Sequence, residues 1–137
     1  EGGIGNDQLV GGADDDVIFG EDGDDVINGD NSARSVAGDI GHVVSTGANR
    51  SGEDSLFGGA GNDAIYGGGG NDVIEGGEGN DELVGRALSG EREDGDTDAD
   101  HIDGGAGNDR IAGSDGIDTL RGGEGDDIIR GDDDLED

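Results

Sequence analysis

A nine-residue period runs through almost the whole of this 137-residue chain. Each unit begins with six glycine-rich residues and ends with three residues of which the middle one is apolar. Eleven units are complete, and two of them are split by insertions. A repeat of fixed length predicts a solenoid, in which each unit is one structural module that stacks on its neighbours. The complete units begin at Gly2, Gly11, Gly20, Gly29, Gly58, Gly67, Gly76, Gly85, Gly104, Gly113 and Gly122.

Two positions of the nine-residue unit show that the repeat keeps a fixed register along the chain. The sixth position is aspartate in every complete unit, although aspartate makes up only about a fifth of the chain. The eighth position is always leucine or isoleucine. A flexible glycine-rich linker has no need of such a register, so this interpretation is disfavoured. The eighth-position residues are Leu9, Ile18, Ile27, Leu56, Ile65, Ile74, Leu83, Ile102, Ile111, Leu120 and Ile129.

The pattern within a unit predicts a turn followed by a short strand. Glycine-rich hexapeptides allow positive φ angles and close approach of the backbone to an ion. In a strand of three residues the eighth position points opposite to the seventh and ninth. Because only the eighth position is reliably apolar, we expect it to face inward. A single unit cannot bury its one leucine or isoleucine, so the units must stack.

The unit resembles the GGxGxDxUx nonapeptide of the repeats-in-toxin (RTX) family, in which U is a large apolar residue. Clear examples are GGAGNDAIY from Gly58 and GGEGNDELV from Gly76. The resemblance implies an all-β fold, a right-handed parallel β-roll with two nine-residue repeats in each coil of eighteen residues. Two short parallel sheets then run along the roll, with a row of turns at each edge. We expect one β-roll over residues 1–137, as a fragment of a longer chain.

Charge and composition restrict the partners. The formal net charge of −30 disfavours nucleic-acid binding and anionic membrane surfaces, and no long apolar run is present for membrane insertion. The absence of cysteine excludes disulfides and thiolate metal sites. One leucine or isoleucine in nine residues cannot offset the conformational entropy of folding, and stacked aspartates repel each other. We therefore expect the chain to fold only with a bound cation.

Calcium is the cation that these turns fit best. It is a hard ion that takes six to eight oxygen ligands in flexible geometry, and aspartate carboxylates and glycine carbonyls supply only oxygen. Zinc and copper prefer imidazole or thiolate, and magnesium demands a tighter octahedron. We expect each ion to lie between the turns of units n and n+2, bridged by two sixth-position aspartates and by backbone carbonyls.

Odd-numbered and even-numbered units, counted along the chain, place their turns on opposite edges of the roll, so the predicted sites fall into two sets. The odd units leave five gaps between consecutive turns, and the even units leave four, so we expect about five Ca²⁺ sites on the odd edge and up to four on the even edge. The odd-edge ligands are Asp7, Asp25, Asp63, Asp81, Asp109 and Asp127. The even-edge ligands are Asp16, Asp54, Asp72, Asp100 and Asp118.

The two edges also differ at the fourth and fifth positions. Asp14 and Asp98 stand where glycine is usual at the fourth position, where each would strain its turn or add a carboxylate. The fifth position is asparagine or aspartate in every odd unit but varies in even units. Since these two residue types tolerate left-handed backbone geometry, this position favours the odd edge as the more regular one.

Both insertions, residues 32–51 and 88–97, fall on the even edge. We expect Phe19 and Phe57 to stack on the outside of the roll, and the first insertion either to fold back over them or to be a disordered loop. The second insertion leads into alternating aspartates from Asp94 to Asp100, which resemble the start of an EF-hand loop; an additional ion and a solvated acidic loop both remain open. A truncated unit at Gly131 predicts that the parent chain continues past residue 137 with a third insertion.

Catalysis has little support in the sequence, because His42 and His101 have no nucleophile at a meaningful spacing. We therefore expect a non-enzymatic module. The resemblance implies a secreted bacterial protein, extracellular or at the cell surface, exported by a type I secretion apparatus. Such a module folds on Ca²⁺ outside the cell and supports the secretion, folding or stability of neighbouring domains of its parent. The alternative is a calcium-rigidified spacer of a surface adhesin, with binding carried by the insertions. We expect a monomer, and the third positions lack the threonine row that ice binding would need.

Overall fold

The computed structural model describes residues 1–12, 15–30, 52–86, 98–114 and 116–131, and within them it contains twelve β-strands and no helix. None of these segments therefore supplies a helix long and apolar enough to cross a membrane. The strands are β1 (Gly3–Ile4), β2 (Gln8–Gly12), β3 (Val17–Asp22), β4 (Val26–Asp30), β5 (Ser55–Ala60), β6 (Ala64–Gly68), β7 (Val73–Glu78), β8 (Glu82–Arg86), β9 (His101–Ala106), β10 (Arg110–Ala112), β11 (Thr119–Glu124) and β12 (Ile128–Arg130).

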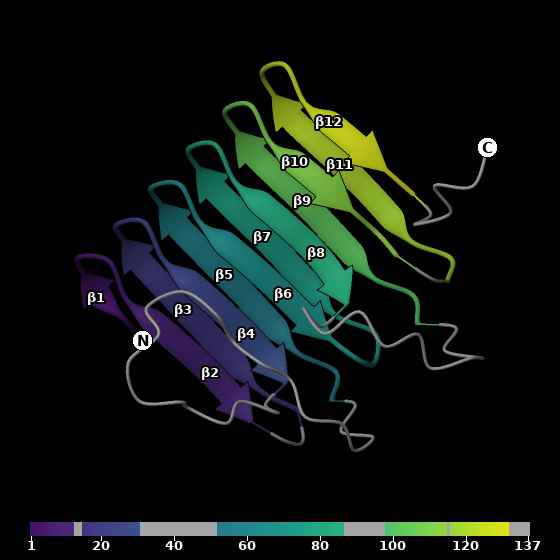
Figure 1. Ribbon diagram of the computed structural model, residues 1–137, viewed down its shortest axis with the longest axis horizontal. Helices are drawn as coiled ribbons and strands as arrows, with labels where there is room; N and C mark the ends of the chain where they lie inside the picture. The colour runs from purple at the N-terminus through teal and green to yellow at the C-terminus, as the bar shows by residue number, and fades with distance from the viewer. Residues whose placement is uncertain (13–14, 31–51, 87–97, 115, 132–137) are drawn as a thin grey trace, which may run out of the picture.

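The strands form two parallel six-stranded sheets that lie face to face (Figure 1). One sheet has the order β1-β3-β5-β7-β9-β11, and the other has the order β2-β4-β6-β8-β10-β12. The chain crosses from one sheet to the other at every turn, so each coil contains two units. The predicted parallel β-roll with two repeats per coil is confirmed.

The register of the coils is regular. Gln8 pairs with Val26, eighteen residues later in the chain. Across the first insertion Val17 pairs with Ser55, at the same position of the next even unit. The pairing across the second insertion keeps the repeat position in the same way. Both insertions therefore leave the stacking of the coils unchanged.

The core is a single row of eighth-position side chains between the two sheets. Eight of the eleven are buried, and Leu9 and Leu120 are partly buried against them. Ile129 differs, with 46% of its surface exposed, because β12 is the outermost strand of its sheet. The inward orientation of the eighth position is thus confirmed for the interior coils, and the C-terminal coil is the exception. The buried members are Ile18, Ile27, Leu56, Ile65, Ile74, Leu83, Ile102 and Ile111.

Most strands are longer than the three residues predicted. Strand β5 begins at the seventh position of one unit and continues to the third position of the next. Its alternation buries Leu56 and Gly58 and leaves Phe57 between them facing outward. The strands extend because the glycine pair also joins the ladder, as in the pairing of Gly59 with Gly77. Glycines of the hexapeptide therefore belong to the sheets as well as to the turns.

On the outer face, Phe19 and Phe57 stack as predicted, with ring centroids 5.0 Å apart and planes 11° apart. The insertions at 32–51 and 88–97 lie outside the described residues, as do Asp14, Asp94 and Asp96. The predicted cover over the two rings and the EF-hand-like start of the second insertion therefore stay predictions.

Candidate metal centre

The sixth-position aspartates of the odd units form one continuous stack along the edge of the roll. The backbone amide of each aspartate donates a hydrogen bond to Oδ1 of the aspartate in the next coil, at 2.8 to 3.0 Å. The turns are held in this order because the strands on both sides are in register with those of the next coil. All six odd-edge aspartates are thus brought together in pairs, as parity predicted.

The even edge repeats the arrangement. The amide of Asp16 donates to Oδ1 of Asp54 at 2.8 Å, although the two residues are 38 positions apart in sequence. The three later steps have the same geometry, at 2.9 to 3.0 Å, and end with Asp100 donating to Asp118. The structure therefore places all eleven predicted aspartates in two stacks with five and four steps.

The second carboxylate oxygen has a different environment. In six of these aspartates Oδ2 is buried and has no hydrogen-bond donor among the described residues. A buried charged oxygen without a partner is costly unless a cation or a proton neutralises it. This set of orphaned oxygens is the strongest indication of a ligand in the molecule. The six residues are Asp7, Asp16, Asp25, Asp63, Asp81 and Asp109.

The first glycine of each unit provides the space for this oxygen. A Cβ built on Gly2 would lie 2.7 Å from Oδ2 of Asp7 and 2.8 Å from the carbonyl oxygen of Gly20 in the next coil. The same two kinds of oxygen crowd the first glycine of most other units. The invariance of this glycine is the signal that sequence reasoning missed: its position faces inward, and only a residue without a side chain leaves room for the aspartate.

The turns also direct backbone carbonyl oxygens towards the next coil. Glycines at the second and fourth positions have φ between +101° and +144°, a region that favours glycine. In the interior coils the fourth-position glycine packs against the fourth-position carbonyl of the preceding coil, as Gly61 does on Gly23 and Gly79 on Gly61. No backbone hydrogen bond among the described residues ends on these fourth-position carbonyls. These carbonyls are therefore candidate ligands for a cation.

Stacking raises the pKa of the central carboxyl groups. Burial is the largest cause, and it raises the pKa of Asp63, Asp109 and Asp81, the last to about 6. The hydrogen bond from the preceding aspartate amide acts in the opposite direction, and the charges of the neighbouring aspartates raise the pKa further. A stack of ionised carboxylates is thus unfavourable without a counter-charge, which is the condition that a divalent cation meets.

The donor set suits calcium. Every available ligand atom in the turns is a carboxylate or carbonyl oxygen, which calcium prefers. Within the described residues no three histidine, aspartate or glutamate side chains converge on one point. The bridging of two carboxylates and backbone carbonyls by one ion therefore stays a prediction.

Asp98 has the second of its two expected roles, that of an added carboxylate. Its Oδ2 accepts a hydrogen bond from the amide of Gly70 at 3.0 Å, so the carboxylate supports the turn. The expectation about the fifth position needs correction: the described non-glycine residues with positive φ are Glu21 and Ser114, so the fifth-position asparagines and aspartates do not adopt left-handed geometry. Their side chains instead accept hydrogen bonds from the next coil, as Asn62 does from Asn80.

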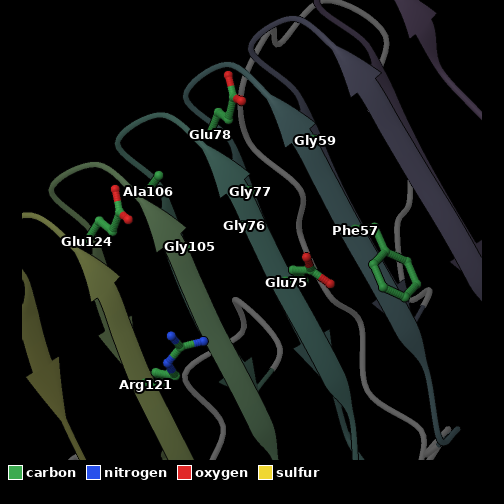
Figure 2. A pocket seen from close by; sticks show the side chains of 10 residues that line it. All are labelled: Phe57, Gly59, Glu75, Gly76, Gly77, Glu78, Gly105, Ala106, Arg121 and Glu124. Carbon is green, nitrogen blue, oxygen red and sulfur yellow. The ribbon is translucent and has the colours of Figure 1, made fainter.

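The other chemical groups lie away from these turns. His101 is exposed at the start of β9, and His42 lies outside the described residues. A shallow hollow of about 530 Å³ lies on the outer face of the first sheet, over the backbone of four glycines; Figure 2 shows the residues that line it. Glu75 and Glu78 project from β7 at its rim, and Arg121 is held by Asp103 at 2.7 Å. The lining contains no serine, threonine, cysteine or histidine, so it offers no nucleophile of these kinds.

Comparison with known proteins agrees with this geometry. A family model described as the RTX calcium-binding nonapeptide repeat, in four copies, matches residues 1–33, 50–83, 94–120 and 112–134. Searches of curated proteins and of solved structures found no significant match. The matched segments cover most of the chain and coincide with the coils. The chain therefore belongs to the RTX calcium-binding nonapeptide repeat family.

Proposed function

We propose that this β-roll folds only when Ca²⁺ binds between the turns of successive coils, and that it serves as a calcium-dependent folding module of a larger secreted protein. The observation that carries the proposal is the stack of sixth-position carboxylates, in which six buried Oδ2 atoms have no hydrogen-bond donor among the described residues; they belong to Asp7, Asp16, Asp25, Asp63, Asp81 and Asp109. A divalent cation would neutralise two carboxylates at once and would join two coils that share few apolar contacts.

The ligands follow from the position of the oxygens. On the odd edge, consecutive aspartates from Asp7 to Asp127 would hold about five ions, together with carbonyl oxygens of the same turns. On the even edge, Asp16 to Asp118 would hold up to four. The carbonyls of the fourth-position glycines are the best backbone candidates because they accept no backbone hydrogen bond among the described residues.

The affinity expected of such sites suits a switch between compartments. Extracellular calcium modules bind with dissociation constants on the order of 0.1 to 1 mM. At about tenfold excess over the dissociation constant each site adds about 1.4 kcal/mol, so five independent sites add about 7 kcal/mol. At calcium concentrations far below the dissociation constant the same sites add almost nothing. The chain would stay unfolded inside the cell, as export through a type I channel requires, and would fold outside.

The test is a titration of the calcium-free fragment, followed by circular dichroism and by counting of bound ions. We expect a cooperative gain of β-structure with calcium, with about five to nine ions bound, and little change with magnesium at the same concentration. Equal folding with magnesium, or binding of only one or two ions, would contradict the proposed sites.

The secretion role needs a separate measurement on the parent protein. Growth of the folded roll outside the cell would hinder backward movement through the channel, so export should slow when external calcium is removed. Equal export rates with and without external calcium would remove this role and leave the folding function untouched.

A further inference from the structure

The fifth position of the odd units forms a second ladder, outside the aspartate stack. A side-chain oxygen at this position accepts a hydrogen bond from the backbone amide of the fifth residue in the next coil, at 2.8 to 3.2 Å. At two of the steps a side-chain amide donates a second hydrogen bond to the same oxygen, from Asn62 to Asp24 and from Asn80 to Asn62. The ladder runs through every odd turn, over Asn6, Asp24, Asn62, Asn80, Asn108 and Asp126.

The even edge has only part of this ladder. Asp15 accepts from the amide of Glu53 at 3.1 Å, and Asn71 accepts from the amide of Ala99 at 2.8 Å. The longer side chain of Glu53 contacts Nδ2 of Asn71, at 3.4 Å. Ala99 has no side-chain oxygen to offer to the amide of Ile117. The even ladder therefore has a side-chain contact in place of the amide bond at its second step, and no side-chain acceptor at its last step.

The inner ladder does not share this gap. At the same step the amide of Asp100 donates to Asp118 at 3.0 Å, and on the odd edge the amide of Asp109 donates to Asp127, also at 3.0 Å. The even and odd turns of the last coil thus have the same hydrogen bond between sixth-position aspartates, but only the odd turn has the fifth-position hydrogen bond.

We propose that the fifth-position ladder holds successive coils in register without a bound metal ion. Its gap at Ala99 makes the turn of residues 116–118 the part of the roll that opens first. These hydrogen bonds are exposed, and the net contribution of one such bond changes a local opening equilibrium about three- to tenfold. Local opening of a solenoid does not require global unfolding, because each coil contacts only its neighbours. The gap would allow one edge of the last coil to open while the other stays closed.

Two backbone amides report on this difference. The amide of Thr119 donates to the carbonyl of Asp100 at 2.8 Å, and the amide of Ile128 donates to the carbonyl of Asp109, also at 2.8 Å. In native-state hydrogen exchange at saturating calcium, we expect Thr119 to exchange about three- to tenfold faster than Ile128, after correction for intrinsic rates. Fraying of the outermost strand β12 would produce the opposite order.

Two matched variants complete the experiment. Ala99→Asn restores the missing acceptor and should slow exchange at Thr119 to the rate of Ile128, while the number of bound calcium ions stays the same. Asn108→Ala creates the corresponding gap on the odd edge and should accelerate exchange at Ile128. Equal wild-type rates, no response to Ala99→Asn, or a changed calcium count would each overturn the inference. Because all samples contain calcium, this outcome is independent of whether calcium is required for folding.

Discussion

Replacement of Asp81 by asparagine should have opposite effects with and without calcium. Asp81 lies at the centre of the odd stack with 2% of its surface exposed, and its Oδ1 accepts the amide of Asp63 at 2.9 Å. Asparagine keeps the size and an acceptor oxygen and removes the charge. The variant therefore separates the cost of the buried carboxylate from its value as a ligand.

The magnitudes follow from the pKa and from the number of sites. In the calcium-free roll, burial raises the pKa of Asp81 from 3.8 to about 6. An increase of this size corresponds to at most about 3 kcal/mol of destabilisation at neutral pH, because solvent screens part of the charge, and Asp81→Asn would remove it. With calcium, Asp81 faces two gaps of the stack, towards Asp63 and towards Asp109. The binding terms add to the stability of the calcium-free roll, so the loss of sites must exceed the gain from the missing charge. At about a hundredfold excess of calcium over the dissociation constant each site adds about 2.7 kcal/mol, so losing two sites costs about 5 kcal/mol and leaves a net loss of at least about 2 kcal/mol.

The assay compares two conditions by circular dichroism. In saturating calcium we expect the variant to unfold at a lower urea concentration than the wild type. In excess chelator, the variant should need less trimethylamine N-oxide to become ordered, since this osmolyte favours compact states. Asp24→Asn is the control, because it makes the same charge change at an exposed position and keeps the acceptor for the Asn62 amide. A variant that is less ordered than the wild type in both conditions would refute the electrostatic reasoning.

Three further predictions use other features of the roll. For pH, burial raises the pKa of Asp63, Asp81 and Asp109, so the calcium-free chain has stability that is present below about pH 4 and lost as the pH rises through the raised pKa, which is about 6 for Asp81. The chain should therefore need less osmolyte at pH 4 than at pH 7, and an unchanged requirement would contradict this. For packing, both Gly77 and Gly3 have positive φ, but only at Gly77 would an added Cβ clash with the carbonyl of Gly59. Unfolding in urea should therefore show a loss of about 2–5 kcal/mol for Gly77→Ala and about 1–2 kcal/mol for Gly3→Ala; equal losses would show that φ alone matters. For backbone strain, Glu21→Gly should raise the stability by up to about 1 kcal/mol because Glu21 has φ of 82°, whereas Glu78→Gly should lower it. Thermal melts in calcium measure both effects, and the opposite order would contradict the reasoning.

The fold and its register could be predicted from the sequence because one period controls both. Aspartate at each sixth position and leucine or isoleucine at each eighth fixed the direction of the side chains, and parity assigned the turns to two edges. The stack from Asp7 to Asp25 is the direct outcome of this parity. Recurrence over many units makes such a repeat easier to read than an ordinary globular sequence.

The remaining features depend on contacts between coils, which one unit does not reveal. The first glycine faces inward because it shares its space with the aspartate of its own unit, as Gly76 does with Asp81. Its invariance in the sequence was a usable signal, but turn flexibility was a sufficient explanation until the neighbouring coil was visible. The role of the fifth position was misassigned for the same reason, since its acceptor bonds with residues such as Asn80 and Asn108 join different coils.

Small-angle X-ray scattering during calcium removal tests the central claim most directly. If bridging cations hold the coils together, excess chelator should expand the fragment to a radius of gyration of about 38 Å, as expected for an unfolded chain of this length, and added calcium should restore the compact form. A compact profile that persists unchanged through complete chelation would show that the apolar row and the hydrogen-bond ladders suffice, and would contradict the account.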